Sequence, residues 1–280
     1  MTVITFAHHK GGTGKTTSCL AIAGCLLKTG EKVLVIDCDP QANATTGLGI
    51  DPEVQTKNMY DVFMNVFEGF LDVSIKDIIV NTQSGIDLAP SSLDLVGVEP
   101  YLYSINERAV VLKEALKPVL NEYRYILIDT PPSMGQFVIN GLLAADRIIL
   151  TLDNSIFAQK GIESINSIFA DIKENTGRKK SPDMAIIARA GALSERKSAL
   201  EELKNIFMQM FSSENPLEKE KLRQDELEAD IKASIKEVCT VPYDSEVIAA
   251  QKAGMPVTVI SPESPASIKY QQISEIIKNW

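Results

Sequence analysis

This 280-residue sequence lacks the apolar segments that would place it in a membrane or send it across one. None of its apolar runs approaches the roughly 20 residues that span a bilayer. The N-terminal stretch, MTVITFAHHK, has neither the basic flank nor the apolar core of a signal peptide. With 45% hydrophobic residues, the chain can still bury a substantial core. We therefore expect a globular protein of the cytoplasm.

Cysteine is scarce as well, with four residues in the whole chain: Cys19, Cys25, Cys38 and Cys239. They form no CxxC pair, and none has the spacing to a histidine that is typical of a zinc site. Zinc-binding and disulfide-rich classes are therefore excluded, and we expect four buried, reduced thiols.

An excess of positive charge is the third missing feature. The 28 basic residues are outnumbered by 37 acidic ones, which gives a net charge of −9. This balance is the opposite of that of a constitutive nucleic-acid binder, so any DNA contact must come from a local patch. Acidic residues are concentrated between Glu214 and Glu237. The surrounding charged segment, about residues 194–238, is interpreted as a solvated helical excursion or as a partner-binding surface.

Short, unalternating apolar runs indicate parallel strands that are buried on both faces. They are Val3–Ala7, Val33–Ile36, Tyr125–Ile128, Ile148–Leu152 and Met184–Ala188. A helical spacing of apolar residues joins the first two and ends at Gly30, and a second helix is expected from Val111 to Leu120. This alternation predicts a three-layer α/β fold with a mostly parallel, twisted sheet. Without a repeat or long linker, residues 1–280 are expected to form one domain.

The strongest functional signal is the sequence KGGTGKTT at Lys10–Thr17, between the first strand and its helix. Its glycines allow the backbone N–H groups to wrap around phosphate, and the helix N-terminus adds a positive dipole end. In such loops the lysine, here Lys15, reaches the β- and γ-phosphates, and the hydroxyl of Thr16 binds Mg²⁺. The adjacent His8 and His9 are interpreted as loop neighbours without a catalytic role, because this chemistry needs no histidine base.

Two further carboxylate positions follow predicted strands. The second strand ends in the turn DCDPQAN, which contains Asp37 and Asp39, and the strand YILID ends at Asp129. Ligands of open α/β sheets bind at this carboxyl edge. An aspartate at the tip of an apolar strand, such as Asp129, is typical of the residue that holds Mg²⁺ in P-loop proteins.

The form KGGxGK[ST]T, with an early second lysine, resembles the deviant Walker A motif of the ParA/MinD group of ATPases. DCDPQANATTGLG is similar to the switch I segment of ParA-type proteins, and DTPPSMGQFVINGLLAADRIIL is similar to their switch II strand, helix and next strand. Val241–Asp244 and Ala253–Val257 resemble the base-contacting loop and the GxPV turn, although a plain strand-exit turn explains Pro242 equally well. The resemblance runs from Thr2 to about Tyr270 and fails most between residues 194 and 238.

The resemblance implies a P-loop NTPase fold with ATP and Mg²⁺ as cofactors. Lys10, Lys15 and Asp39 would be catalytic, with Lys10 crossing to a partner's nucleotide and Asp39 orienting water. The nucleotide would be contacted by Lys10, Gly11, Gly12, Thr13, Gly14, Lys15, Thr16, Thr17, Pro242 and Tyr243. The metal would be held by Thr16, Asp37, Asp39 and Asp129.

In biological terms, the resemblance favours the short partition ATPases of the Soj type. Such a protein would form an ATP-bound homodimer on non-specific DNA, associate with the nucleoid and segregate chromosome or plasmid DNA. A ParB-like centromere-binding protein, or another partner, would stimulate its slow ATP hydrolysis.

Three alternatives remain open. A MinD-like protein would act on a membrane, but the tail SIKYQQISEIIKNW lacks the basic polar face of a surface-binding helix and is expected to pack as a last helix, without stable membrane association. A second alternative keeps the switch and moves a protein complex instead of DNA. A third is a metabolic enzyme; because no cysteine lies between Asp129 and Cys239, an iron–sulfur protein is disfavoured, whereas a small-molecule ligase stays possible.

Overall fold

The computed structural model describes residues 1–67, 72–153, 158–190, 231 and 235–280. Most of the charged segment expected as a helical excursion, residues 194–238, lies outside these residues. In the described part, no helix is both long and apolar enough to cross a bilayer.

A twisted sheet forms the centre of the described chain, with the strand order β3-β4-β2-β5-β1-β6-β7-β8. All neighbouring strands pair in parallel except β3, which runs antiparallel to β4 at the edge. The strands are β1 Thr2–Ala7, β2 Val33–Asp37, β3 Val80–Asn81, β4 Asp87–Ala89, β5 Tyr125–Asp129, β6 Arg147–Asp153, β7 Met184–Ala190 and β8 Glu237–Pro242. The five strands expected from apolar runs are confirmed, and each lies within one of these elements.

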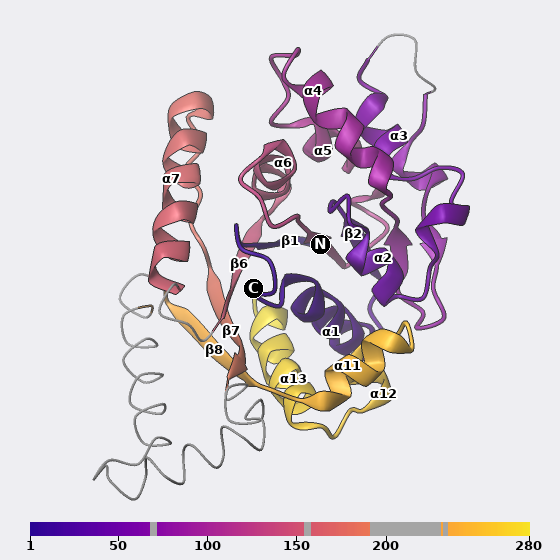
Figure 1. Cartoon of the computed structure of the whole chain (residues 1–280), viewed down its shortest axis with the longest axis vertical. Coiled ribbons are helices and arrows are strands. Elements are labelled where there is room, and N and C mark those ends of the chain that lie inside the picture. Colours follow the sequence, from indigo (N-terminus) through magenta and orange to yellow (C-terminus); the bar gives the residue numbers. More distant parts are fainter. Residues whose placement is uncertain (68–71, 154–157, 191–230, 232–234) are drawn as a thin grey trace, which may run out of the picture.

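Helices cover both faces of this sheet (Figure 1). The α-helices are α1 Lys15–Leu27, α2 Asn43–Gly47, α3 Met59–Met64, α4 Val98–Leu102, α5 Val111–Ala115, α6 Gln136–Ala144, α7 Ala158–Thr176, α11 Ser245–Lys252, α12 Val257–Ile260 and α13 Pro265–Lys278. The 3₁₀ helices are η1 Pro52–Val54, η2 Ile75–Asp77, η3 Leu93–Gly97 and η4 Lys117–Val119. Together with the sheet they form the predicted three-layer α/β arrangement.

One face of the sheet is covered by α1 and the C-terminal helices. Ile4 and Phe6 of β1 point into the same core as Leu20 of α1 and Tyr270 of α13. The helix α1 ends at Leu27, and Gly30 follows in a left-handed conformation with φ 84°, as its expected role in ending the helix requires. Because α1 is buried along most of its length, the phosphate-binding sequence at its start is held rigidly.

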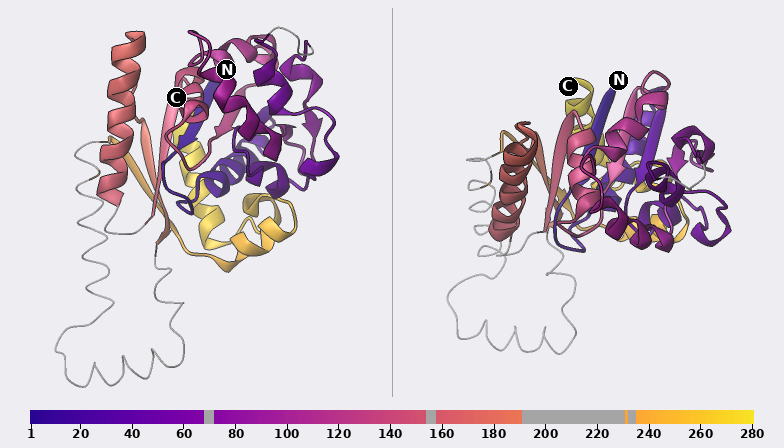
Figure 2. Two further views of the ribbon diagram at one scale, coloured as in Figure 1. Left: turned by 45° about the horizontal axis from the view of Figure 1, so that its top comes forward. Right: turned by 90° about the horizontal axis from the view of Figure 1, so that it is seen from above.

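The opposite face is covered by α3–α6 and, farther along the sheet, by α7, as the two views of Figure 2 show. Val3 of β1 points into this second core with Phe63 of α3 and Phe137 of α6. Ile165 of α7 and Leu142 of α6 share a third cluster. Apolar residues along each central strand are therefore buried alternately on the two faces, which explains the unalternating runs in the sequence.

The expected helix from Val111 to Leu120 was wrong in its extent. The α-helix α5 ends at Ala115, and a separate 3₁₀ helix, η4, covers Lys117–Val119. Pro118 explains the break, since it cannot donate the backbone hydrogen bond that a continuing α-helix would need. The apolar positions keep a helical spacing across this break, which is why the pattern alone overestimated the helix.

Candidate functional site

The loop between β1 and α1 leads into a helix N-terminus that lacks a side-chain cap. Gly14 is the N-cap residue, with φ 87° and ψ 20°, and no side chain accepts a hydrogen bond there. The first N–H groups of α1 are thus left for an anion. A Cβ atom at Gly14 would lie only 2.9 Å from Cβ of Ala188 on β7, so glycine is required for the loop to approach that strand.

Lys15, the first residue of α1, is 6% exposed. Its Nζ donates a hydrogen bond of 3.3 Å to the carbonyl oxygen of Lys10. Burial lowers the pKa of Lys15, and the negative charges of Asp129 and Asp39 oppose that shift. A negatively charged acceptor would stabilise this buried ammonium group more than the neutral carbonyl does. A phosphate group beside the loop is such an acceptor.

Asp129 lies at the end of β5, where the sequence placed a metal-site carboxylate. Its Oδ2 accepts a 2.6 Å hydrogen bond from Oγ1 of Thr16. Its Oδ1 is buried and has no hydrogen-bond partner among the described residues. Burial, and then the charge of Asp37, raise the pKa of Asp129 well above its ordinary value. A divalent cation would satisfy the unpaired oxygen, so the residues present fit a magnesium ion.

No group of three or more histidine, cysteine, aspartate or glutamate side chains in the described chain is arranged to hold a metal by itself. This agrees with the way proteins hold Mg²⁺, through one or two carboxylates, with water and phosphate oxygens as the other ligands. The protein would therefore hold the ion together with the nucleotide, mainly through Asp129 and Thr16.

Asp37 is fully buried beside Asp129, its partner in the register of β2 and β5. Its Oδ1 accepts the N–H of Asp39, and its Oδ2 accepts both the N–H and the hydroxyl of Thr45. Burial raises its pKa to about 6, although these hydrogen bonds oppose the shift. Both oxygens thus hold the turn after β2 in place, and a direct metal contact by Asp37 stays a prediction.

Asp39 is also close to the loop, and only 4% of its surface is exposed. Its Oδ1 accepts the N–H of Gln41 at 2.9 Å, and its carbonyl oxygen accepts the N–H of Ala42. Ala42 has φ 52°, the one positive φ of a non-glycine residue in the described ranges. The turn that carries Asp39 is therefore strained at Ala42 and held by hydrogen bonds on both sides.

Lys10 lies half-exposed at the rim of the loop. Its ammonium group forms an ion pair with Asp153 at the end of β6. Its N–H donates to Nδ1 of His8, a buried residue whose pKa is lowered to about 4 by burial and by the charges of His9 and Lys15. In this single chain the side chain of Lys10 thus contacts its own subunit, and a contact with a partner's nucleotide stays a prediction.

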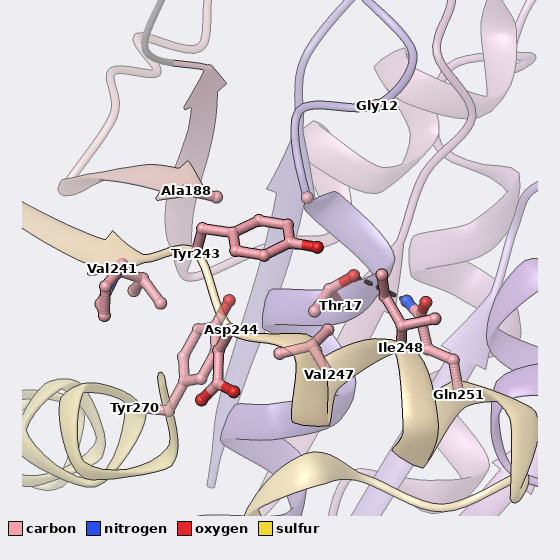
Figure 3. A pocket seen from close by; sticks show the side chains of 12 residues that line it. Gly12, Thr17, Ala188, Val241, Tyr243, Asp244, Val247, Ile248, Gln251 and Tyr270 are labelled. Carbon is pink, nitrogen blue, oxygen red and sulfur yellow. Dashed lines mark hydrogen bonds between the residues drawn. The ribbon is translucent and has the colours of Figure 1, made fainter. Parts of the chain in front are cut away.

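An open pocket of about 260 Å³ adjoins the loop (Figure 3). Its lining residues come from the loop, the ends of β7 and β8, and the helices that follow β8: Gly12, Gly14, Thr17, Ala188, Val241, Pro242, Tyr243, Asp244, Val247, Ile248, Gln251 and Tyr270. The structure therefore brings Pro242 and Tyr243 together with the loop, as a base-contacting role requires. Most of the lining is apolar, which suits a flat aromatic ring.

Five lining residues were not singled out for the site from the sequence: Ala188, Val247, Ile248, Gln251 and Tyr270. Three of them, Val247, Ile248 and Gln251, lie on one face of α11, at the spacing i+3, i+4 and i+7 from its N-cap Asp244. Nε2 of Gln251 donates a 3.0 Å hydrogen bond to Oγ1 of Thr17, which ties this helix to α1. The helical spacing was visible in the sequence, but it did not show which side of α11 would face the loop.

Three of the four cysteines, Cys19, Cys25 and Cys38, are buried as expected, and the fourth is only partly covered. Burial raises the pKa of Cys19, Cys25 and Cys38. These thiols are therefore inert members of the core.

Comparison with known proteins agrees with this geometry. The AAA domain family AAA_31 matches residues 1–183. The chain is 37% identical over 164 residues to the sporulation initiation inhibitor protein Soj of Bacillus subtilis, covering 58% of this chain and 62% of Soj. It is 37% identical over 166 residues to the chromosome partitioning protein ParA of Caulobacter vibrioides, covering 58% and 60%. These matches span about three fifths of the length of each relative.

Solved structures share the fold over almost the whole chain. McdA from Cyanothece has a TM-score of 0.76 at 23% identity, covering 99% of this chain and 98% of McdA. A cobyrinic acid a,c-diamide synthase from Mycobacterium smegmatis has a TM-score of 0.73 at 22% identity, covering 99% and 93%. At such identities the likeness shows the fold alone, so these structures do not decide which task the protein performs. The family match and the loop at Lys10–Thr17 together show that the chain belongs to the ParA/MinD-type P-loop family AAA_31.

Proposed function

We propose that this protein is an ATPase that binds ATP with Mg²⁺ at the loop Lys10–Thr17 and uses the nucleotide as a switch. The observation that carries the proposal is the unpaired, buried Oδ1 of Asp129 beside Thr16, at the start of a helix with open N–H groups. A cation and an anion are needed there together, and a magnesium nucleotide supplies both. The pocket next to the loop has room for the base and ribose.

Each residue of the site then has a specific task. Lys15 binds the terminal phosphates, while Thr16 and Asp129 orient the magnesium ion, which neutralises phosphate charge. Asp39 lies on the turn after β2, where its carboxylate orients the attacking water. Hydrolysis in this class depends on positioning and charge stabilisation, so the rigid hydrogen bonds around Asp37 and Asp39 are as important as the groups themselves.

The proposal includes a dimer in which Lys10 reaches the nucleotide of the second copy. In the structure its ammonium group is paired with Asp153, and both side chains are partly exposed. An ion pair of that kind contributes little free energy, about 0–1 kcal/mol, so a phosphate group can replace Asp153 as partner. A cation supplied across an interface can accelerate phosphoryl transfer by about 10³ to 10⁵.

The task favoured by the relatives is DNA partition. ParA of C. vibrioides is named for chromosome partitioning, and its match covers 58% of this chain. We propose that the ATP-bound dimer binds DNA without sequence preference and that a ParB-like protein stimulates its release. A MinD-like membrane task is disfavoured because Ile273 and Ile277 of α13 are buried against the core, as expected for a packed last helix.

The test uses the Asp39→Ala variant, which should bind ATP and remain in that state. Its binding to a random DNA duplex is measured by fluorescence anisotropy, with ATP or ADP, at 50 to 200 mM salt. ATP-dependent binding that weakens about tenfold over this range, as two phosphate contacts require, supports the proposal. Asp171→Ala, at an exposed position of α7, is the matched control and should hydrolyse ATP like the wild type.

Anionic liposomes are offered to the same samples. Binding to liposomes and not to DNA would replace the partition task with a membrane task. If the ATP-bound dimer forms and binds neither, the DNA proposal is wrong, and a protein cargo or a biosynthetic reaction becomes the better explanation.

A further inference from the structure

The loop that follows Asp129 is fixed differently at its two ends. At its start, the hydroxyl of Thr130 donates a 2.7 Å hydrogen bond to the carbonyl oxygen of Phe6 inside the sheet. At its end, Gly135 is the N-cap of α6 and offers no side chain to cap the helix. The second anchor must therefore come from elsewhere in the fold.

Glu99 of α4 supplies that anchor. Its Oε1 accepts the N–H of Gln136, the first residue of α6, at 3.1 Å. A carboxylate in this position both satisfies an open N–H group and interacts favourably with the helix dipole. The two residues are 37 positions apart in sequence, so the contact joins α4 to the loop only in the folded chain (Figure 1).

The carboxylate of Glu99 also lies very close to Cα of Gly135, where any other residue would carry a Cβ atom. A Cβ atom added to Gly135 would lie 2.2 Å from Oε1 of Glu99, far inside any allowed distance. The conformation of Gly135, with φ −80° and ψ −170°, is open to all residues, so a side chain here would conflict only with the carboxylate of Glu99, which would have to move. The absence of a side chain at Gly135 thus leaves room for the carboxylate that accepts the N–H of Gln136.

The loop held in this way adjoins the phosphate-binding loop. A Cβ atom at Gly11 would lie 3.9 Å from Cβ of Pro132, so the middle of the 129–135 loop lies next to the glycine-rich turn. Pro132 and Met134 are exposed, whereas Pro131 is buried, and the hydroxyl oxygen of Ser133 accepts the N–H of Gly135. A displacement at its Gly135 end would move the segment that faces the nucleotide.

We propose that Glu99 is a positioning residue for the ATPase reaction: by holding the first turn of α6, its carboxylate sets the position of the loop from Asp129 to Gly135. The inference rests on the proposed function, because the reaction that it assists is ATP hydrolysis. Glu99 itself contacts neither the phosphate-binding loop nor the pocket among the described residues. Its removal should therefore reduce kcat more than it changes the KM for ATP.

The experiment measures ATP turnover of Glu99→Ala, Glu99→Gln, Gly135→Ala and the double variant Glu99→Ala/Gly135→Ala. We expect Glu99→Ala to lower kcat about fivefold or more, with a change in KM below about twofold, as the loss of one charged helix cap implies. Glu99→Gln keeps an oxygen acceptor and should recover part of the rate. Glu107→Ala, an exposed glutamate a few residues on, is the matched control and should leave both constants unchanged.

The double variant gives the sharpest outcome. Gly135→Ala alone should impair turnover because its methyl group displaces Glu99, but in the Glu99→Ala background nothing is left to displace. The double variant should thus be no slower than Glu99→Ala. Two outcomes would overturn the inference. In one, the decreases in kcat of the two single variants multiply in the double variant; in the other, Glu99→Ala has the same kcat and KM as Glu107→Ala.

Hydrogen exchange separates this inference from the proposed function. In nucleotide-free protein, peptides covering residues 130–138 should exchange faster in Glu99→Ala than in the wild type, while peptides from α13 should not change. A wild type without ATP turnover would overturn the proposed function, and the exchange result would still decide whether Glu99 holds the loop. Unchanged exchange in 130–138 would refute that role.

Discussion

Replacement of Gly14 by alanine adds one methyl group to the phosphate-binding loop and tests whether ATP binding depends on the loop's close approach to β7. Gly14 has φ 87°, where an L-residue costs about 1–2 kcal/mol. The new methyl group would also lie 2.9 Å from Cβ of Ala188, and overpacking of this kind costs about 1–3 kcal/mol. Because the first N–H groups of α1 follow directly, we expect the strain to shift them and to weaken ATP binding at least about tenfold.

Gly30→Ala is the matched control for the backbone part of this cost. Gly30 has φ 84°, but a Cβ atom there would meet nothing within 4 Å, and the residue lies past the far end of α1. This variant should lose about 1–2 kcal/mol of stability and keep the wild-type affinity for ATP. Stability is measured by urea unfolding, and affinity by titration with a fluorescent ATP analogue.

Ala188→Gly isolates the part of the Gly14→Ala effect that comes from the steric clash with β7. In this background the methyl group of Gly14→Ala no longer meets Cβ of Ala188, so the double variant should bind ATP more tightly than Gly14→Ala alone. If Gly14→Ala binds ATP like Gly30→Ala, or if Ala188→Gly brings no recovery, the described contact between the loop and β7 does not control the binding site.

Two further predictions concern strain and pH. Ala42→Gly should raise the free energy of unfolding by about 0.5–1 kcal/mol, because glycine adopts φ 52° without strain, whereas Ala249→Gly on the exposed face of α11 should lower it by a similar amount; urea unfolding decides the sign. The pKa of His8 is about 4 in the folded chain and 6.5 in its ordinary range, so the unfolded chain binds more protons and stability falls as the pH drops from 6.5 towards 4. Between pH 7 and pH 5 this residue should account for about 2 kcal/mol of that loss. His8→Asn, which keeps an acceptor for the N–H of Lys10, should remove this part of the pH dependence in urea unfolding, and His9→Asn should retain it; equal pH dependence in His8→Asn and the wild type would refute the buried, neutral state of His8.

Features with a local signal could be predicted from the sequence. The strands from β1 to β7 that carry continuous apolar runs, and the glycine that ends α1, follow from residues a few positions apart. The loop Lys10–Thr17 and the strand-end position of Asp129 were located in the same way. Helix α5 shows the limit of such patterns, since the apolar spacing continues past Pro118 while the backbone cannot.

Contacts between distant side chains that belong to no motif could not be predicted. The pairing of Lys10 with Asp153 joins residues 143 positions apart, and the cap from Glu99 to Gln136 depends on how α4 packs beside α6. The face of α11 that lines the pocket is likewise set by its packing on α12 and by the hydrogen bond from Gln251 to Thr17 of α1. No periodicity in the sequence carries this information, because it arises from tertiary packing.

The central claim is that the loop and the pocket bind ATP with magnesium, and calorimetric titration of the wild type and Lys15→Ala with ATP tests it most directly. We expect binding that strengthens when Mg²⁺ is added, that is lost in Lys15→Ala, and that is unchanged in Lys117→Ala, a lysine on the exposed surface. Binding that is absent in the wild type, or that survives unchanged in Lys15→Ala, would contradict the account.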